Sequence, residues 1–195
     1  MALTPSTMLE LGTPMPAFRL PDPQGKLVAS DDFTDSPALL VAFICNHCPY
    51  VKHIREGLVQ LGRDYIKHDV GIVAINSNDV QEYPDDRPEE MVRLARTFDF
   101  PFLFDDDQSV ARAFHAACTP DFFLFDGERR LVYRGQFDDS RPDNHLPVTG
   151  DSVRQALDAL LAGQTPDPNQ KPSTGCNIKW KKDAPDTDTP DGTSG

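Results

Sequence analysis

An unbroken apolar segment runs from Ala38 to Ile44. Its length is typical of a strand buried on both faces and falls far short of the ~20 residues that a membrane helix requires. Directly after it, apolar residues recur at helical spacing between polar ones, at Tyr50, Val51, Ile54, Leu58, Leu61 and Tyr65. The pattern therefore predicts a central parallel strand that leads straight into an amphipathic helix.

Other apolar patterns predict helices and strands after this unit and an arm before it. A second apolar strand spans Val70 to Ile75, and the polar loop from Asn76 to Pro88 is long enough to face a substrate at the sheet edge. Elsewhere we expect a hairpin or extended arm at 14–30, helices at 88–98, 110–114 and 151–162, and strands at 102–104, 122–125 and 131–133.

This alternation of helices around a buried strand favours an α/β protein, a three-layer sandwich with a mixed central sheet and an N-terminal β-hairpin. A chain of 195 residues with 38% hydrophobic content can bury one good core, so we expect a single domain at 1–182. Residues 164–182 would form an irregular, Pro-rich extension of that domain. We expect the acidic tail at 183–195 to be disordered.

The chain is acidic, with a formal net charge of -12. This charge argues against nucleic acid and anionic membrane surfaces as partners. The N-terminus has neither the basic start nor the apolar run of a secretory signal, which makes the cytoplasm the default location. Four cysteines in this length do not make a disulfide scaffold, and a reducing compartment favours reactive roles for them.

The sequence Cys45-Asn46-His47-Cys48-Pro49 lies at the predicted junction of strand and helix. Free backbone N–H groups and the helix dipole stabilise a thiolate at such a junction, so we expect Cys45 to be an activated nucleophile. One helical turn brings Cys48 close enough to attack a mixed disulfide on Cys45. His47, as an imidazolium, would further favour the Cys45 thiolate. The motif indicates dithiol exchange.

Other interpretations of the motif are weaker. A structural zinc site usually needs four ligands, and the sequence holds no second CxxC or paired histidine motif. We therefore expect neither a metal nor a cofactor. His47 could also be an exposed histidine without influence on Cys45.

Several motifs together carry a family resemblance. They are Leu11 to Leu20, Phe43 to Lys52, Ala74 to Asp79, Cys118 to Phe122 and Gly175 to Trp180. On these residues the chain, from about Leu11 to Lys182, resembles the thioredoxin-fold proteins of the alkyl hydroperoxide reductase/thiol-specific antioxidant superfamily, and most of all its peroxiredoxin-like thioredoxin branch. The resemblance implies a thioredoxin-like sandwich in which Cys45 attacks and Cys48 resolves. It also implies that Pro120, after Thr119, is a cis proline facing the two cysteines.

The sequence departs from the family pattern at several positions. Leu39 stands where thioredoxins place a buried acid, so general-base help would come from water, His47 or another carboxylate. Cys45 replaces the threonine of the peroxiredoxin Thr-x-x-Cys pattern, and Asp151 stands where an arginine is often found, which leaves Arg134 as a substitute. We therefore predict a thiol-disulfide oxidoreductase with an antioxidant or protein-disulfide exchange role, and a thiol peroxidase as the alternative.

The auxiliary thiols Cys118 and Cys176 leave three alternatives open. They could form a disulfide that pins the extension to the core, relay electrons from the CxxC pair, or remain unlinked in a reducing cytosol. We also expect Trp180 to pack the extension onto the body.

A different class of function is a copper-binding metallochaperone. Thioredoxin-fold copper carriers resemble this arrangement, and Cys45, Cys48 and His145 would be the ligands. For the leading hypothesis, the partners would be a disulfide-containing protein or a small thiol or peroxide substrate. A cellular thiol reductant would recycle the cysteines.

Overall fold

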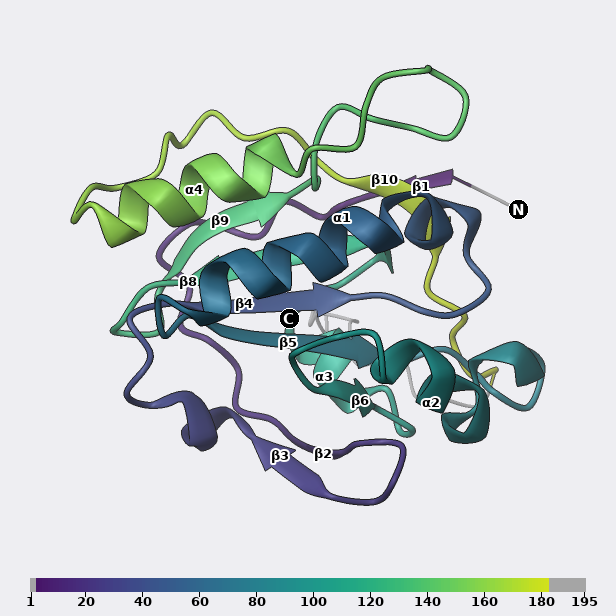
Figure 1. The fold of residues 1–195 in the computed structure, drawn as a ribbon. Coiled ribbons are helices and arrows are strands. Elements are labelled where there is room, and N and C mark those ends of the chain that lie inside the picture. The colour runs from purple at the N-terminus through teal and green to yellow at the C-terminus, as the bar shows by residue number, and fades with distance from the viewer. Residues whose placement is uncertain (1–2, 183–195) are drawn as a thin grey trace, which may run out of the picture.

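The computed structural model describes residues 3–182, so the predicted disordered tail at 183–195 lies outside the described residues. A five-stranded sheet with the order β6-β5-β4-β8-β9 forms the centre of the fold (Figure 1). Its parallel strands are β4, β5 and β6, and β8 and β9 run antiparallel to their neighbours. The strands span Leu39–Phe43 (β4), Gly71–Asn76 (β5), Phe102–Phe104 (β6), Asp121–Phe125 (β8) and Leu131–Gly135 (β9). The predicted mixed sheet is confirmed.

Helices cover both faces of this sheet. On one face, α1 (Pro49–Ile66), α2 (Pro88–Ala95) and α4 (Asp151–Leu161) pack into one apolar cluster with Leu40 and Ala42 of β4. On the other face, Leu39, Val41 and Phe43 join a second cluster with α3 (Ser109–Ala113) and the hairpin of β2 (Arg19–Pro21) and β3 (Leu27–Ala29). Because successive side chains of a strand alternate between faces, an all-apolar β4 serves both clusters. The three-layer sandwich and the N-terminal hairpin agree with the sequence prediction.

The two ends of the described chain form a small additional sheet. Its order is β1-β10-β7, from strands Leu3–Pro5, Thr174–Asn177 and Cys118–Thr119. In Figure 1, β1 and β10 lie side by side near the N-terminus. The prediction of an irregular extension is wrong here, because 174–177 is a strand.

A glycine lets this short, polar strand pack closely against its neighbour β7. A Cβ at Gly175 would lie 2.1 Å from the backbone oxygen of Thr119, so only glycine permits this approach. Further along, Ile178 is buried, whereas Trp180 is exposed and lies 4.6 Å from the guanidinium of Arg112. Ile178 and Trp180 thus both contact the body of the domain. Among residues 3–182, no helix combines the length and apolar character needed to cross a membrane.

Candidate active site

The CxxC motif occupies the junction between the carboxyl end of β4 and the start of α1. Both cysteines are fully buried. Cys48 is the N-cap of α1, and Pro49 is the first helical residue, where its missing N–H loses no helical bond. Cys45 lies before the helix. The predicted strand-helix junction is thus confirmed, but Cys48 rather than Cys45 is the residue at the helix N-terminus.

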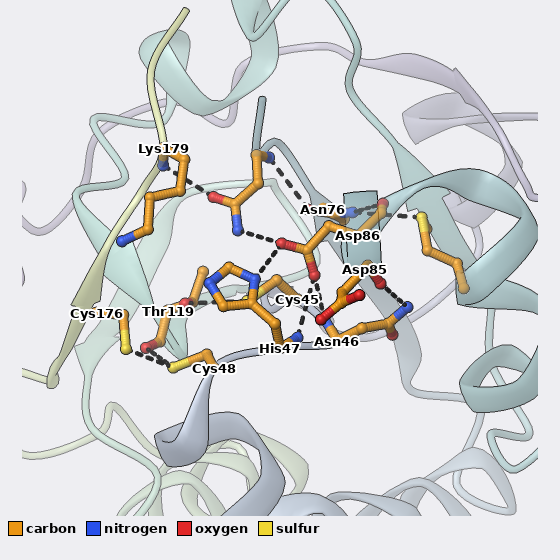
Figure 2. Close-up of polar contacts among 12 residues, drawn as sticks. Cys45, Asn46, His47, Cys48, Asn76, Asp85, Asp86, Thr119, Cys176 and Lys179 are labelled. Carbon is orange, nitrogen blue, oxygen red and sulfur yellow. Dashed lines mark hydrogen bonds and ion pairs between the residues drawn. The ribbon is translucent and has the colours of Figure 1, made fainter. Parts of the chain in front are cut away.

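Thr119 and Pro120 face the two cysteines across the site. The Thr119–Pro120 peptide bond is cis, as the resemblance implied. The Cys48 thiol lies 3.3 Å from the backbone oxygen of Thr119, and the Cys45 sulfur lies 3.6 Å from the Thr119 hydroxyl (Figure 2). Thr119 therefore contacts both members of the CxxC pair.

Cys176 brings a third sulfur to the same place. Its Sγ lies 3.0 Å from Sγ of Cys48. In the β-ladder Cys176 lies opposite Thr119, while Cys118 lies opposite Asn177. Because neighbouring residues of a strand point to opposite faces, Cys118 and Cys176 face away from each other. The four cysteines are free thiols, and the Cys118–Cys176 disulfide alternative is not formed.

The carboxylate of Asp86, which sequence analysis did not single out, contacts the CxxC motif. Asp86 is fully buried at the end of a short 3-10 helix, Pro84–Asp86, inside the polar loop. Its Oδ1 accepts hydrogen bonds from the backbone N–H groups of Asn46 and His47, at 2.8 and 3.1 Å. Its Oδ2 contacts Nδ1 of His47 and accepts a 2.8 Å bond from the Asn78 amide. Asp86 therefore fixes the backbone and the imidazole between the two cysteines.

The same loop is joined to the C-terminal extension. The Asn78 side-chain oxygen accepts a 2.9 Å hydrogen bond from the backbone N–H of Lys179. The Tyr83 ring stacks on His47 with ring centroids 5.3 Å apart. Gln108 donates to the backbone oxygens of both Ser77 and Lys179 at 2.8 Å. Hydrogen bonds thus join the loop to the extension beside the cysteines. Figure 2 shows the part of this network that runs from Lys179 to Asp86.

The comparison with protein families identifies the chain. A model described as the AhpC/TSA family matches residues 11–134, more than half of the sequence. The chain belongs to the AhpC/TSA family. A search of curated proteins found no significant match.

Solved structures extend the comparison beyond the segment that the AhpC/TSA model matches. An uncharacterized conserved protein from Geobacillus kaustophilus is 50% identical, with a TM-score of 0.92 and coverage of 94% of this chain and 99% of that one. A hypothetical protein from Sinorhizobium meliloti is 51% identical, with a TM-score of 0.90 and coverage of 92% and 99%. The thioredoxin domain of a thiol-disulfide oxidoreductase from Bacteroides vulgatus is 18% identical, with a TM-score of 0.57 and coverage of 75% and 96%. The fold is therefore thioredoxin-like.

In this AhpC/TSA protein the electrostatics of the two cysteines differ from the sequence prediction. A hydrogen bond to Cys48, burial, and the negative charge of Asp86 raise the pKa of Cys45 well above its ordinary value. Hydrogen bonds from the Cys45 and Cys176 thiols and from the Val51 backbone lower the pKa of Cys48 to about 5, although burial opposes them. These directions favour a thiolate on Cys48, whereas the sequence predicts one on Cys45. Helix and thiol donors converge on the N-cap residue, whereas Asp86 lies near Cys45.

His145 and Arg134, which the sequence suggested for copper binding and for peroxide chemistry, do not join the cysteines in the site. Within 3–182, the group of three or more candidate metal ligands with atoms within 4.8 Å of one another is Cys45, His47 and Asp86. His145 is exposed and does not join the cysteines in such a group, so the copper ligand set is not assembled. Arg134 donates to the Leu9 backbone and to Gln170, which commits its guanidinium elsewhere.

Proposed function

We propose that the protein is a thiol-disulfide oxidoreductase in which Cys45 and Cys48 alternate between a dithiol and a disulfide. The observation that carries this proposal is the placement of both sulfurs against Thr119, with the acidity concentrated on Cys48. AhpC/TSA membership and the thioredoxin-like fold support the same chemistry.

In the proposed cycle, Cys48 attacks first. Its thiolate attacks one sulfur of a substrate disulfide, forms a mixed disulfide and releases one substrate thiolate. The Cys45 thiol then gives up its proton and attacks Cys48 Sγ, which releases the second substrate thiolate and leaves a Cys45–Cys48 disulfide. The substrate gains two electrons and the cysteine pair loses two. A cellular thiol reductant then returns two electrons to the cysteine pair.

The surrounding residues have separate tasks in this cycle. The Cys45 sulfur, an imidazole nitrogen of His47 and a carboxylate oxygen of Asp86 lie within 4.8 Å of one another. His47 and Asp86 would accept the proton that Cys45 loses, in place of the acid that Leu39 replaces. The Thr119 backbone oxygen accepts a hydrogen bond from the Cys48 thiol while that thiol is protonated, and the Thr119 hydroxyl lies 3.6 Å from the Cys45 sulfur. Because both sulfurs are buried, groups that cover Cys48 must move aside before a substrate disulfide reaches it.

A second candidate function is thiol peroxidase activity, and the lowered pKa of Cys48 favours it. The Cys48 thiolate would attack the peroxide O–O bond, becoming a sulfenic acid and releasing an alcohol. Cys45 would then condense with it, forming the disulfide and releasing water. Arg134, bound to Leu9 and Gln170, does not supply the cation that the peroxiredoxin pattern calls for.

We further propose a reducing compartment, by default the cytoplasm, and disulfide-containing proteins or small thiols as partners. A net charge of -12 favours partners that are not themselves strongly acidic. In such a compartment the pair would have an antioxidant or protein-disulfide exchange role.

Equilibration in glutathione redox buffers tests the proposal. Acid quenching, differential alkylation and mass spectrometry would follow each cysteine separately. We expect a reversible two-electron couple between Cys45 and Cys48. A chain with no such couple would contradict the exchange function. A parallel assay of hydroperoxide consumption, with Cys48→Ser as the inactive control, separates the peroxidase candidate.

A further inference from the structure

We propose that Cys176 is a third redox thiol, which β10 places where the cysteine of a substrate would lie. Its sulfur displaces Cys45 from the Cys45–Cys48 disulfide, so that a Cys48–Cys176 disulfide forms instead. This inference rests on the proposed function, because it needs the Cys45–Cys48 disulfide as its starting state.

Distance and direction both support the assignment. The 3.0 Å between the sulfurs of Cys176 and Cys48 is a hydrogen-bonded contact, and both side chains are buried. In Figure 2 the two sulfurs point toward each other beside Thr119. Cys118, two residues before Pro120, faces the other way, with its sulfur 3.7 Å from the Pro120 backbone oxygen. Of the two auxiliary thiols, only Cys176 contacts the CxxC pair.

The strand that carries Cys176 is held on both of its edges. It pairs with β7 on one side and with β1 on the other, where Cys176 lies opposite Leu3. Before it, the Ser173 hydroxyl donates to the Pro120 backbone oxygen at 2.5 Å. After it, Asn78 and Gln108 bind the Lys179 backbone. The sulfur of Cys176 is therefore delivered by ordered backbone rather than by a free tail.

The backbone position of β10 is also that of a docked peptide. Extended peptides bind many proteins by adding a strand to an exposed sheet edge, with alternate side chains directed into the site. Here β10 pairs antiparallel with Thr119, the residue just before the cis proline, and this register directs the Cys176 side chain to Cys48. The protein's own chain thus occupies the edge that a cysteine-bearing substrate strand would use.

The chemical step balances without an added oxidant. In the disulfide state the Cys176 thiol loses its proton and attacks Cys48 Sγ. The Cys45–Cys48 bond breaks as the Cys48–Cys176 bond forms, and Cys45 leaves as a thiolate that takes up a proton. One disulfide replaces another, so no electrons are gained or lost. The product has a free Cys45 thiol and a covalent link between β10 and the start of α1.

Disulfide mapping of the full chain tests the inference. Wild type, Cys45→Ser and Cys118→Ser would be equilibrated with oxidised and reduced glutathione, quenched with acid, alkylated and digested without reduction. In Cys45→Ser we expect a Cys48–Cys176 linked peptide as the main oxidised product. The matched control Cys118→Ser should retain the linkages of the wild type. The double variant Cys45→Ser/Cys176→Ser should instead carry glutathione on Cys48.

Two negative results have different meanings. If Cys45→Ser carries glutathione on Cys48 while Cys176 stays fully alkylated, the third-thiol assignment is overturned, even when the wild type forms Cys45–Cys48. If the wild type forms no Cys45–Cys48 disulfide, the proposed function itself fails. Circular dichroism of each variant checks that the serine substitutions leave the fold unchanged.

Discussion

Cys45 and Cys48 belong to one short motif but lie in opposite electrostatic surroundings. Hydrogen-bond contacts with the Cys45 thiol, the Cys176 thiol and the Val51 backbone in the first turn of α1 lower the pKa of Cys48 to about 5. The hydrogen bond to Cys48, burial and the negative charge of the buried Asp86 carboxylate raise the pKa of Cys45. The difference teaches that hydrogen-bond donors favour a thiolate on the residue at the helix N-cap, and that burial and a carboxylate distant in sequence oppose one on Cys45.

The largest expected effect concerns which cysteine captures a substrate. In a Cys176→Ser background, Cys45→Ser should form a mixed disulfide with glutathione at Cys48 at pH 6. Cys48→Ser in the same background should react more slowly, because burial and the charge of Asp86 still raise the pKa of Cys45 when Cys48 is absent. Stopped-time mass spectrometry measures both rates. Equal reaction rates for the two variants would contradict the difference in acidity between Cys45 and Cys48.

The second effect is a pH dependence of stability. The folded pKa of Cys48, about 5, lies below its ordinary value of 9.0, so unfolding takes up a proton between these pH values. Its contribution to the free energy of unfolding is therefore full above pH 9 and is lost as pH falls through 5. Between pH 6 and 8 the advantage of wild type over Cys48→Ala should grow by at most about 1.4 kcal/mol per pH unit.

Urea denaturation in a phosphine reductant measures this stability difference. Cys118→Ala is the matched control, because burial raises the pKa of Cys118 and keeps its thiol protonated across the same pH range. Its difference from wild type should stay constant with pH. A pH-independent difference for Cys48→Ala as well would contradict a buried thiolate at that position.

A third, smaller effect tests the role of Asp86. Asp86→Asn removes the charge that raises the pKa of Cys45 but keeps a side-chain oxygen for the backbone bonds. In a Cys48→Ser background, alkylation of Cys45 at pH 7 should become faster, because the charge of Asp86 is one cause of the raised pKa of Cys45. Asp85→Asn removes the same charge from an exposed neighbour and should leave the rate within about twofold. The same rate in both variants would contradict the role of Asp86.

The smallest effect separates the two contacts of Thr119. Thr119→Val removes the hydroxyl near Cys45, a contact that lowers the pKa of that cysteine, but keeps the backbone oxygen that faces Cys48. Cys45 alkylation in the Cys48→Ser background should slow by about threefold. Thr119→Ser should restore the rate. An unchanged rate in Thr119→Val would contradict this contact between the Thr119 hydroxyl and Cys45.

Local sequence patterns sufficed for the framework of the site. The apolar run before Cys45 and the helical spacing after Pro49 placed the motif correctly, because a buried strand and an amphipathic helix each leave a strong periodic signal. The resemblance supplied the cis bond at Pro120. The relative acidity of Cys45 and Cys48 could not be predicted from the sequence, since it depends on whether the helix begins at Cys45 or at Cys48, and periodicity does not fix such boundaries.

The rest of the site depends on contacts distant in sequence. Asp86 meets the Asn46 backbone across 40 positions, and Cys176 meets Cys48 across 128. Asp86 stands in a polar loop where several acids look equivalent, and β10 has neither alternation nor β-branched residues beyond Thr174. No local pattern marks either contact. The strand forms there through its pairing with β1 and β7, and glycine at position 175 permits its close approach to Thr119.

The most direct test of the central claim is the pH dependence of alkylation of each cysteine in the reduced wild-type chain. Brief iodoacetamide pulses between pH 4 and 10, followed by peptide mass spectrometry, would read Cys45 and Cys48 separately. The account predicts that Cys48 becomes reactive with a midpoint near pH 5 and that Cys45 stays unmodified up to about pH 9. Modification of Cys45 before Cys48 as pH rises would contradict it.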